Sequence, residues 1–304
     1  MKNLSFISVG FLALLQACST TLNTPLLDTE YSAIQKAHIH NAVTQDEVIP
    51  AVKVSNTSAA AAGGGLLGAL IVAKIDAEKN KSRNKSAQAI IEPLWNETLD
   101  YDYRAMSSEH VENTLAAHFT LANPGESKSF VGLSKHELID EVNALDEGEV
   151  YALVYPRYAL IDDSRKLQTS LEARIFKKPT VASNAMPKPI YQNAFFFESE
   201  IVGDGGESSM NLWTADNASL FKSNAQANIE VLAELLSYDL KAPDESCNAS
   251  QTIMMENGYT YQPFKVKGVK IEASEGVHTV RHKTGYIYAT KAQPAFGVTA
   301  AKCK

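Results

Sequence analysis

The chain has no surplus of positive charge and very few cysteines. Its 28 lysines and arginines are outnumbered by 35 aspartates and glutamates, and the net charge is −7. Nucleic-acid-binding domains carry a basic patch or stripe, so this composition disfavours nucleic acid as a partner. The three cysteines form no Cys-x-x-Cys pair. The sequence therefore lacks the close ligand spacing that zinc sites and thiol redox centres use.

Short catalytic motifs are also missing. The chain contains no Gly-x-x-x-x-Gly-Lys-Ser/Thr sequence to bind phosphates and no Gly-x-Ser-x-Gly sequence to form a nucleophile elbow. No repeat of fixed period is present. Hydrophobic residues make up 45% of the 304 positions, which is typical of globular proteins. The length is enough for one large domain, or for a domain with a small appendage.

The N-terminus carries a short apolar segment. Lys2 is followed by an apolar run over residues 4–15, which ends in Leu15-Gln16-Ala17-Cys18. A basic start, an apolar stretch of this length and small residues at a cleavage point predict a secretory signal that is removed. The run is shorter than the ~20 residues that a membrane-spanning helix needs. We therefore expect cleavage between Ala17 and Cys18.

The tetrapeptide that ends at Cys18 resembles the lipobox of bacterial lipoproteins. In that family the cysteine becomes the acylated first residue of the mature chain, so the resemblance implies lipidation of Cys18. Ser19 replaces the aspartate that is associated with inner-membrane retention, which implies the periplasmic face of the outer membrane. Each buried CH₂ contributes ~0.8 kcal/mol, so several acyl chains anchor a soluble domain firmly. The alternatives are a secreted protein with an unmodified cysteine and a short transmembrane anchor.

Two further cysteines, Cys247 and Cys303, remain near the C-terminus. Because an exported compartment is oxidising, we expect a disulfide between them. The closed loop of about 57 residues would stabilise the fold by about 4 kcal/mol through loop-closure entropy. A metal-binding or redox pair is the alternative, and the wide spacing of the two residues disfavours it.

A second unusual segment, residues 59–73, has no charged or polar side chain and contains Gly63, Gly64, Gly65 and Gly68. A stretch rich in lysine and arginine follows it. Small residues let helices approach closely, and the segment resembles the glycine zippers of some outer-membrane lipoproteins. That resemblance implies a helix contact within an oligomer or a position in the membrane interface. The alternative is a buried helix or loop with glycines at tight turns and a solvated basic stretch after it.

The rest of the chain predicts helices first and strands later. Residues 18–56 are polar and weakly periodic, which is typical of a tether. A helix is expected through Ile91 until Pro93 kinks or breaks it. A second helix follows a cap at Ser107 or Ser108. The pair Ser134 and Glu137 fits a capping box at the start of a third.

Alternating apolar residues from position 150 predict an antiparallel meander of three strands, with an edge or bulge at Pro156 and a third strand over 190–202. A long helix capped by Thr214 or Asp216 and ended by Pro243 is expected to cover it. The expected fold is α+β: an antiparallel sheet of at least three strands packed by helices within residues 57–243, plus a small disulfide-closed all-β C-terminal module over 244–304.

Two pairs of carboxylates are candidate chemical groups. Glu198 and Glu200 alternate on a strand, and glycosidases use paired carboxylates as acid and base. A solvent-facing strand side is the more ordinary interpretation. Asp162 and Asp163 fall at a hairpin turn, where solvated carboxylates are expected.

Four histidines are candidate metal ligands. His38 and His40 share one face of an extended segment, but zinc sites usually need a third protein ligand. His110 and His118 are two helical turns apart, too far to share an ion, and His118 is expected at the edge of the core.

The order of the predicted elements is loosely similar to that of small α/β domains of envelope lipoproteins. This similarity implies a non-enzymatic accessory protein in envelope assembly, transport or secretion, which acts through protein contacts and self-association and uses no cofactor or metal. The alternatives are a hydrolase of peptidoglycan or another envelope glycan, and an oligomeric secretion component that embeds its Gly-rich segment in the membrane.

Overall fold

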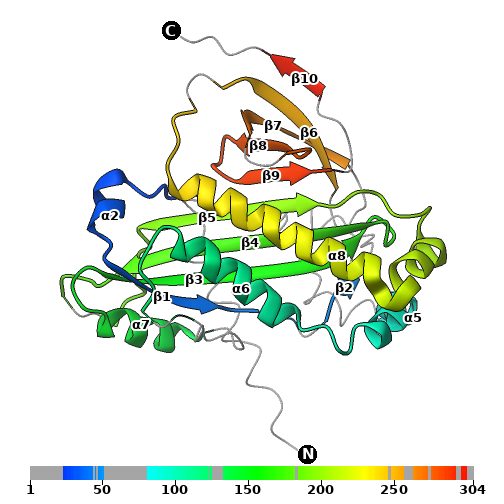
Figure 1. Cartoon of the computed structure of the whole chain (residues 1–304), viewed down its shortest axis with the longest axis horizontal. Coiled ribbons are helices and arrows are strands. Elements are labelled where there is room, and N and C mark those ends of the chain that lie inside the picture. The colour runs from blue at the N-terminus through cyan, green and yellow to red at the C-terminus, as the bar shows by residue number, and fades with distance from the viewer. Residues whose placement is uncertain are drawn as a thin grey trace, which may run out of the picture.

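A mixed sheet of ten strands organises the part of the chain that the structure describes (Figure 1). This computed structural model describes residues 23–43, 45, 47–50, 81–122, 124, 133–181, 184–245, 248–256, 263–272, 275–291 and 296–299. The strand order is β1-β3-β4-β5-β9-β8-β7-β6-β10, with β2 also beside β3. The strands are β1 (Lys36–Asn41), β2 (Ile49–Pro50), β3 (Glu149–Ile161), β4 (Lys166–Lys177), β5 (Tyr191–Glu198), β6 (Ser250–Glu256), β7 (Pro263–Ile271), β8 (His278–His282), β9 (Ile287–Thr290) and β10 (Phe296–Thr299). The helices are α2 (Asp28–Ala33), α5 (Lys81–Glu97), α6 (Tyr103–Ala116), α7 (Lys135–Ala144) and α8 (Gly206–Leu240).

The α+β class is confirmed, whereas the expected antiparallel sheet is corrected to a mixed one. Strands β3, β4 and β5 form the predicted antiparallel meander. Strands β1 and β2 pair with β3 in parallel, and β9 pairs with β5 in parallel. Parallel neighbours need long connections. Here α5, α6 and α7 lie in the chain between β1 and β3, and α8 lies between β5 and β9.

Pro156 lies in a local gap of the sheet. Strand β1 pairs with β3 as far as Val154, and β2 pairs with it only from Ala159. Proline has no backbone N–H to donate, so it is tolerated where no partner strand needs one. The expectation of an edge at Pro156 is thus met on one side of β3, while β4 pairs with it on the other.

Much of the segment expected to be a tether belongs to the fold. Thr24 and Gln192 exchange backbone hydrogen bonds of 2.8 and 2.9 Å, and β1 follows within the sheet. Ala37 and Val43 are fully buried. The polar composition of β1 is misleading, because its backbone pairs with β3 on one side and Ala37 also bonds the 120–122 segment on the other. The tether expectation is therefore wrong for residues 24–43.

The C-terminal strands extend the sheet. Strands β6, β7, β8 and β9 are antiparallel neighbours, and β9 joins them to β5. Phe196 of β5 stacks on Tyr288 of β9 at a ring separation of 4.9 Å. The expected β module is therefore hydrogen-bonded into the main sheet, and β7 runs without a break from Pro263 to Ile271.

Helices cover both faces of the first half of the sheet (Figure 1). On one face, α6 and α8 pack on β3, β4 and β5 through a core that includes Leu115, Leu171 and Leu232. On the other face, α7 packs Leu138 against Leu153 of β3. The alternation of side chains along each strand thus gives two apolar faces, and the C-terminal strands share the second face with α7.

The sequence predicted the start of α7 correctly but not the start of α6. The Ser134 and Glu137 capping box is present at the start of α7. Helix α6 instead starts at Tyr103 with Asp102 as its cap. Ser107 and Ser108 are buried within that helix and accept hydrogen bonds from Asn41. Pro93 lies inside α5, which continues to Glu97.

Helix α8 begins earlier than expected, after Gly205, and is interrupted in its first half. Asp216, Asn217 and Ala218 have φ values of 50, 59 and 55°, which is left-handed backbone. Of the two expected caps, Thr214 therefore lies just before this break and Asp216 lies within it. The second part of α8 is the amphipathic helix that the sequence predicts, and it covers β4 and β5.

Candidate functional site

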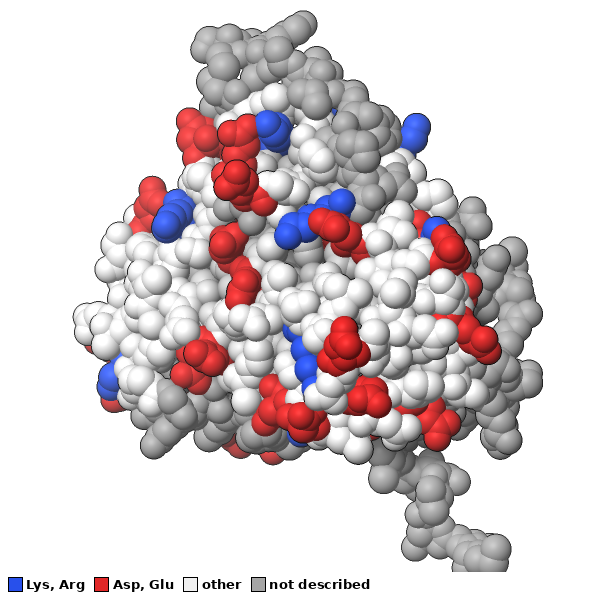
Figure 2. Space-filling view, turned by 45° about the vertical axis from the view of Figure 1, so that its right-hand side comes forward, with Lys and Arg blue, Asp and Glu red and all other residues white. Residues whose placement is uncertain are grey.

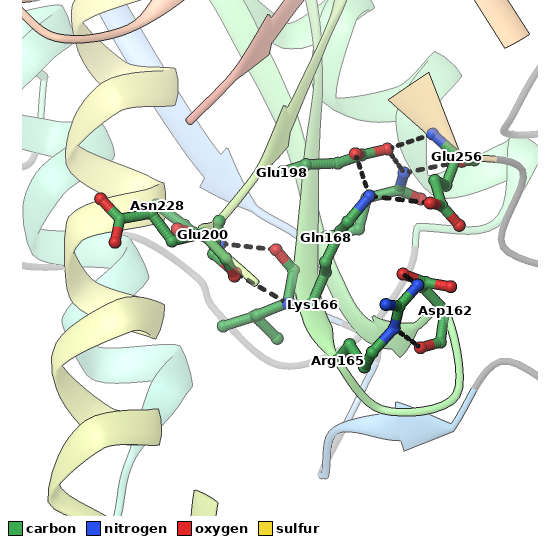
Figure 3. Close-up of polar contacts among 10 residues, drawn as sticks. Asp162, Arg165, Lys166, Gln168, Glu198, Glu200, Asn228 and Glu256 are labelled. Atoms are coloured by element: carbon green, nitrogen blue, oxygen red, sulfur yellow. Dashed lines mark hydrogen bonds and ion pairs between the residues drawn. The ribbon is translucent and has the colours of Figure 1, made fainter. Parts of the chain in front are cut away.

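A buried charge cluster joins three strands at one end of the sheet (Figure 3). Lys166 of β4 is 1% exposed and Glu198 of β5 is fully buried. The Lys166 ammonium lies 3.0 Å from a carboxylate oxygen of Glu256 in β6 and 3.5 Å from one of Glu198. Lys166, Glu198 and Glu256 thus place one cation and two acidic groups together away from solvent. We take this cluster as the candidate site.

The curl of the sheet brings these residues together. Lys166 and Glu198 point away from α8, onto the face shared with the C-terminal strands. Strand β6 is four places from β5 in the strand order. Its last residue nevertheless returns to that strand, and the backbone N–H of Glu256 donates to Glu198 at 2.6 Å. Gln168 also donates to Glu198, at 3.1 Å. The cluster therefore closes the curled sheet upon itself.

The β3–β4 turn borders the cluster. Asp162 is buried and forms an ion pair with Arg165. Asp162, Asp163 and Ser164 all have positive φ, between 54 and 66°. The indole N–H of Trp213 donates to the Ser164 carbonyl at 2.5 Å, so α8 holds the turn in this conformation.

Burial governs the protonation of the cluster. It raises the pKa of Glu198 to about 7, although the Lys166 ammonium and the Glu256 N–H both act in the opposite direction. Burial raises the pKa of Glu256 as well, against the hydrogen bond and charge of Lys166. Desolvation disfavours the charged carboxylate and one ammonium serves two acids. The cluster therefore takes up a proton close to neutral pH.

A second buried cluster lies toward the other end of the C-terminal strands. Arg281 of β8 pairs with Asp239 in the last turn of α8 at 2.5 Å and with Glu245 at 2.8 Å. Asp239 also accepts hydrogen bonds from the Tyr191 hydroxyl at 2.7 Å and from Asn193 at 2.8 Å. This cluster ties β8 to α8 and β5.

Neither cluster lines either of two surface depressions on the described residues. One, of about 430 Å³, lies beside the β7–β8 connection between Lys270 and His278. The other, of about 400 Å³, lies beside α5 and includes Pro93 and Thr214. Both clusters instead join strands of the described sheet to their neighbours.

The expected pair Glu198 and Glu200 is not formed. Glu198 is buried, so the solvent-facing interpretation is wrong for it, while Glu200 is exposed just beyond the strand. In Figure 3, Glu200 lies apart from the contacts that Glu198 makes. The second acidic residue beside Glu198 is instead Glu256, 58 positions later, whose backbone N–H donates to the Glu198 carboxylate. No motif near Glu198 in the sequence predicts this contact. The turn carboxylates divide similarly, because Asp163 is exposed as expected and Asp162 is buried.

The histidines have ordinary partners. His38 lies 3.1 Å from Glu149, and His110 lies 3.7 Å from Glu230. His118 contacts the Tyr31 hydroxyl at 3.1 Å and Ser237 at 2.8 Å, which confirms its place at the core edge. Burial lowers the pKa of His118. Among the described residues, no group of three or more histidine, cysteine, aspartate or glutamate side chains could hold a metal ion.

The other predicted sites lie outside the described residues. They are the cleavage and lipidation residues Ala17 and Cys18, the glycines Gly63, Gly64, Gly65 and Gly68, and the cysteines Cys247 and Cys303. Cleavage, acylation, close glycine contacts and the disulfide therefore stay predictions.

Comparison of the chain with protein-family models, with curated proteins and with solved structures gives no match. Within the described ranges, none of the helices combines the length and the apolar character needed to cross a membrane.

Proposed function

We propose that this chain is a lipid-anchored protein of the bacterial outer membrane, facing the periplasm, which acts through contacts with other envelope proteins and not as an enzyme. The observation that carries the proposal is the Leu15-Gln16-Ala17-Cys18 sequence directly after a short apolar run. Acyl chains on Cys18 would hold the folded body at the membrane surface.

The place where the fold begins supports the anchoring half of the proposal. Thr24 is already hydrogen-bonded to Gln192, and only residues 19–23 separate it from Cys18. A folded body that starts so soon after the cysteine suits a protein that works at the membrane surface.

The described surface supports the protein-contact half. Four exposed apolar side chains belong to segments at the end of the sheet where α5 lies, which we call the α5 end (Figure 1): Leu99 follows α5, Ile201 lies between β5 and α8, and Leu212 and Leu220 lie in the first half of α8. Exposed apolar patches mark interaction surfaces, and we propose that these four side chains form one. The buried carboxylates, in contrast, lie under the C-terminal strands with partners of their own.

Mass spectrometry of the mature N-terminus, together with membrane fractionation, tests the anchor. We expect acylated Cys18 as the first residue and recovery with the outer membrane, and Cys18→Ser should release the protein into the soluble periplasmic fraction. An unmodified N-terminus on the native protein would disprove the anchor.

Crosslinking in intact cells tests the contact role. A photoreactive side chain at Leu99 or Leu212 should capture an envelope protein, and the same probe at exposed Glu272, beyond the end of β7, serves as the control. Equal labelling at all three positions, or none, would contradict a partner surface at the α5 end.

A further inference from the structure

The chain enters the fold at a defined end of the sheet. Thr24 pairs with Gln192 near the start of β5. Asn23 packs against Gly285 in the β8–β9 turn so closely that any side chain at Gly285 would collide with it. Glu30 of α2 pairs with Lys177 at the end of β4, at 2.6 Å. Figure 1 shows α2 at the left-hand end of the sheet, opposite α5. We call this the α2 end.

Covalent geometry limits how far this end can lie from an anchored Cys18. Five residues separate Cys18 from Thr24. A fully extended chain spans at most ~3.3–3.6 Å per residue, so the α2 end lies within roughly 20 Å of the first mature residue. The α5 end has no such constraint from this linker.

The α2 end has the surface chemistry of a membrane interface. Leu27 and Val181 are 60% and 76% exposed, and Met186 is exposed with them. Lys178 and Lys188 are exposed in the β4–β5 connection, and Lys283 is exposed in the β8–β9 turn. Apolar side chains interspersed with lysines are typical of surfaces that lie among lipid headgroups.

Charge favours the same orientation. Anionic lipid surfaces attract lysines and repel carboxylates. The α2 end also carries exposed Asp28, Asp146 and Glu147, while Glu30 is neutralised by Lys177. Acidic side chains predominate in Figure 2, where the α5 end is turned forward. Lys178, Lys188 and Lys283 are the groups at the α2 end that anionic headgroups would attract.

We propose that the α2 end rests on the anionic lipid surface that holds Cys18, with Leu27, Val181 and Met186 among the headgroups and Lys178, Lys188 and Lys283 on the phosphates. The inference rests on the proposed acylation of Cys18. It adds a fixed orientation, in which the α5 end and its apolar side chains face away from the bilayer toward partners.

Depth-dependent quenching of tryptophan tests the orientation. Full-length acylated protein carrying Val181→Trp or Leu99→Trp is placed in vesicles of phosphatidylethanolamine and phosphatidylglycerol with brominated acyl chains. Both positions are highly exposed, at 76% and 80%. The emission of native Trp95 and Trp213 is measured on the unsubstituted protein and subtracted.

We expect brominated lipid to remove most of the added emission at position 181 and to leave that at position 99 unchanged. Equal quenching at both positions, or stronger quenching at 99, would overturn the orientation while the anchor stands. Failure of the native protein to float with the vesicles would overturn the proposed function, and the orientation with it.

Charge reversal tests the lysines separately. In the Val181→Trp protein, the triple change Lys178→Glu, Lys188→Glu and Lys283→Glu should reduce quenching severalfold, and the matching triple change to arginine should preserve it. Quenching that survives charge reversal would overturn the role of these lysines in headgroup binding.

Discussion

The guanidinium of Arg281 lies 2.5 Å from the carboxylate of Asp239, and this ion pair joins a C-terminal strand to the last turn of α8. Lys166 and Glu256 form the corresponding link between β4 and β6, at 3.0 Å. The two links lie on different parts of the curled C-terminal strands. Together they fix β6 and β8 on the body of the sheet, where backbone pairing alone would connect them only through β9.

Removing Arg281 should therefore destabilise the protein strongly. Arg281→Gln leaves Asp239 and Glu245 largely buried without their cation, and loss of one partner of a buried ion pair costs about 3–5 kcal/mol. Urea denaturation measures the free energy of unfolding. Lys270→Gln in β7 is the matched control, because its partner Glu272 is exposed and exposed ion pairs contribute little. Equal losses in the two variants would contradict a structural role for the Arg281 cluster.

Glu198→Gln should change how stability depends on pH. The pKa of Glu198 is about 7 in the folded protein and 4.5 is its ordinary value. Between these values the folded protein retains a proton that the unfolded chain has lost, so its stability falls as pH rises. The variant lacks this proton. Its free energy of unfolding relative to the native protein should therefore rise by about 3 kcal/mol from pH 4 to pH 7, at 1.36 kcal/mol per pKa unit.

Any constant loss from the hydrogen bonds to Glu198 does not affect that difference in slope. Glu200→Gln removes the same charge at an exposed position two residues away and is the control. Parallel pH profiles for native protein and Glu198→Gln would show that the buried carboxyl does not hold a proton near neutral pH.

The elements that the sequence predicted well depend on neighbours in the chain. The Ser134 and Glu137 cap, the Asp162–Ser164 turn and the alternation along β3 and β4 are all determined within a few residues. The burial of Glu198 is different, because it follows from the return of Glu256 across a curled sheet. Nothing within ten residues of Glu198 specifies that contact, so the local pattern of alternating glutamates suggested solvent exposure.

Strand β1 is a second element whose place in the fold depends on a distant contact. His38, His40 and Asn41 give it a polar sequence, and a polar segment near the N-terminus predicts a tether. Its place in the sheet comes from backbone pairing with β3, more than 100 positions later. Short strands bound mainly through backbone groups carry little hydrophobic signal, so the sequence placed the start of the fold well after Thr24, where the structure has it.

Gly205 should tolerate alanine less well than Gly276. Both have positive φ, at 105 and 71°, so each substitution incurs backbone strain of about 1 kcal/mol or more. Gly205 combines its φ with a ψ of 165°, a region essentially confined to glycine, and a side chain there would also displace the Asp163 carboxylate 2.8 Å away, whereas one at Gly276 would meet nothing within 4 Å. Thermal unfolding should therefore show a larger drop in Tm for Gly205→Ala. The reverse order would contradict the contact between the β3–β4 turn and the start of α8.

The predicted disulfide can be tested by changing Cys247 and Cys303 singly and together. If the two are bonded, each single serine variant should lose as much stability as the double variant, about 4 kcal/mol from loop-closure entropy. Adding reductant should lower the stability of the native protein to the same level. Additive losses from the single variants, or no effect of reductant, would show that the cysteines act independently.

The Gly-rich segment, residues 59–73, gives a further prediction, which is close helix contact through Gly64 and Gly68. Gly64→Leu with Gly68→Leu should weaken self-association and reduce membrane partitioning, since leucine side chains keep helices apart. The substitutions belong in a Cys18→Ser protein, where acyl chains cannot mask the effect. Gly64→Ala with Gly68→Ala is the control, because alanine keeps the surface small. Sedimentation velocity and vesicle flotation measure the two properties. If both stay unchanged in the leucine variant, the glycines serve turns or internal packing and the contact role is wrong.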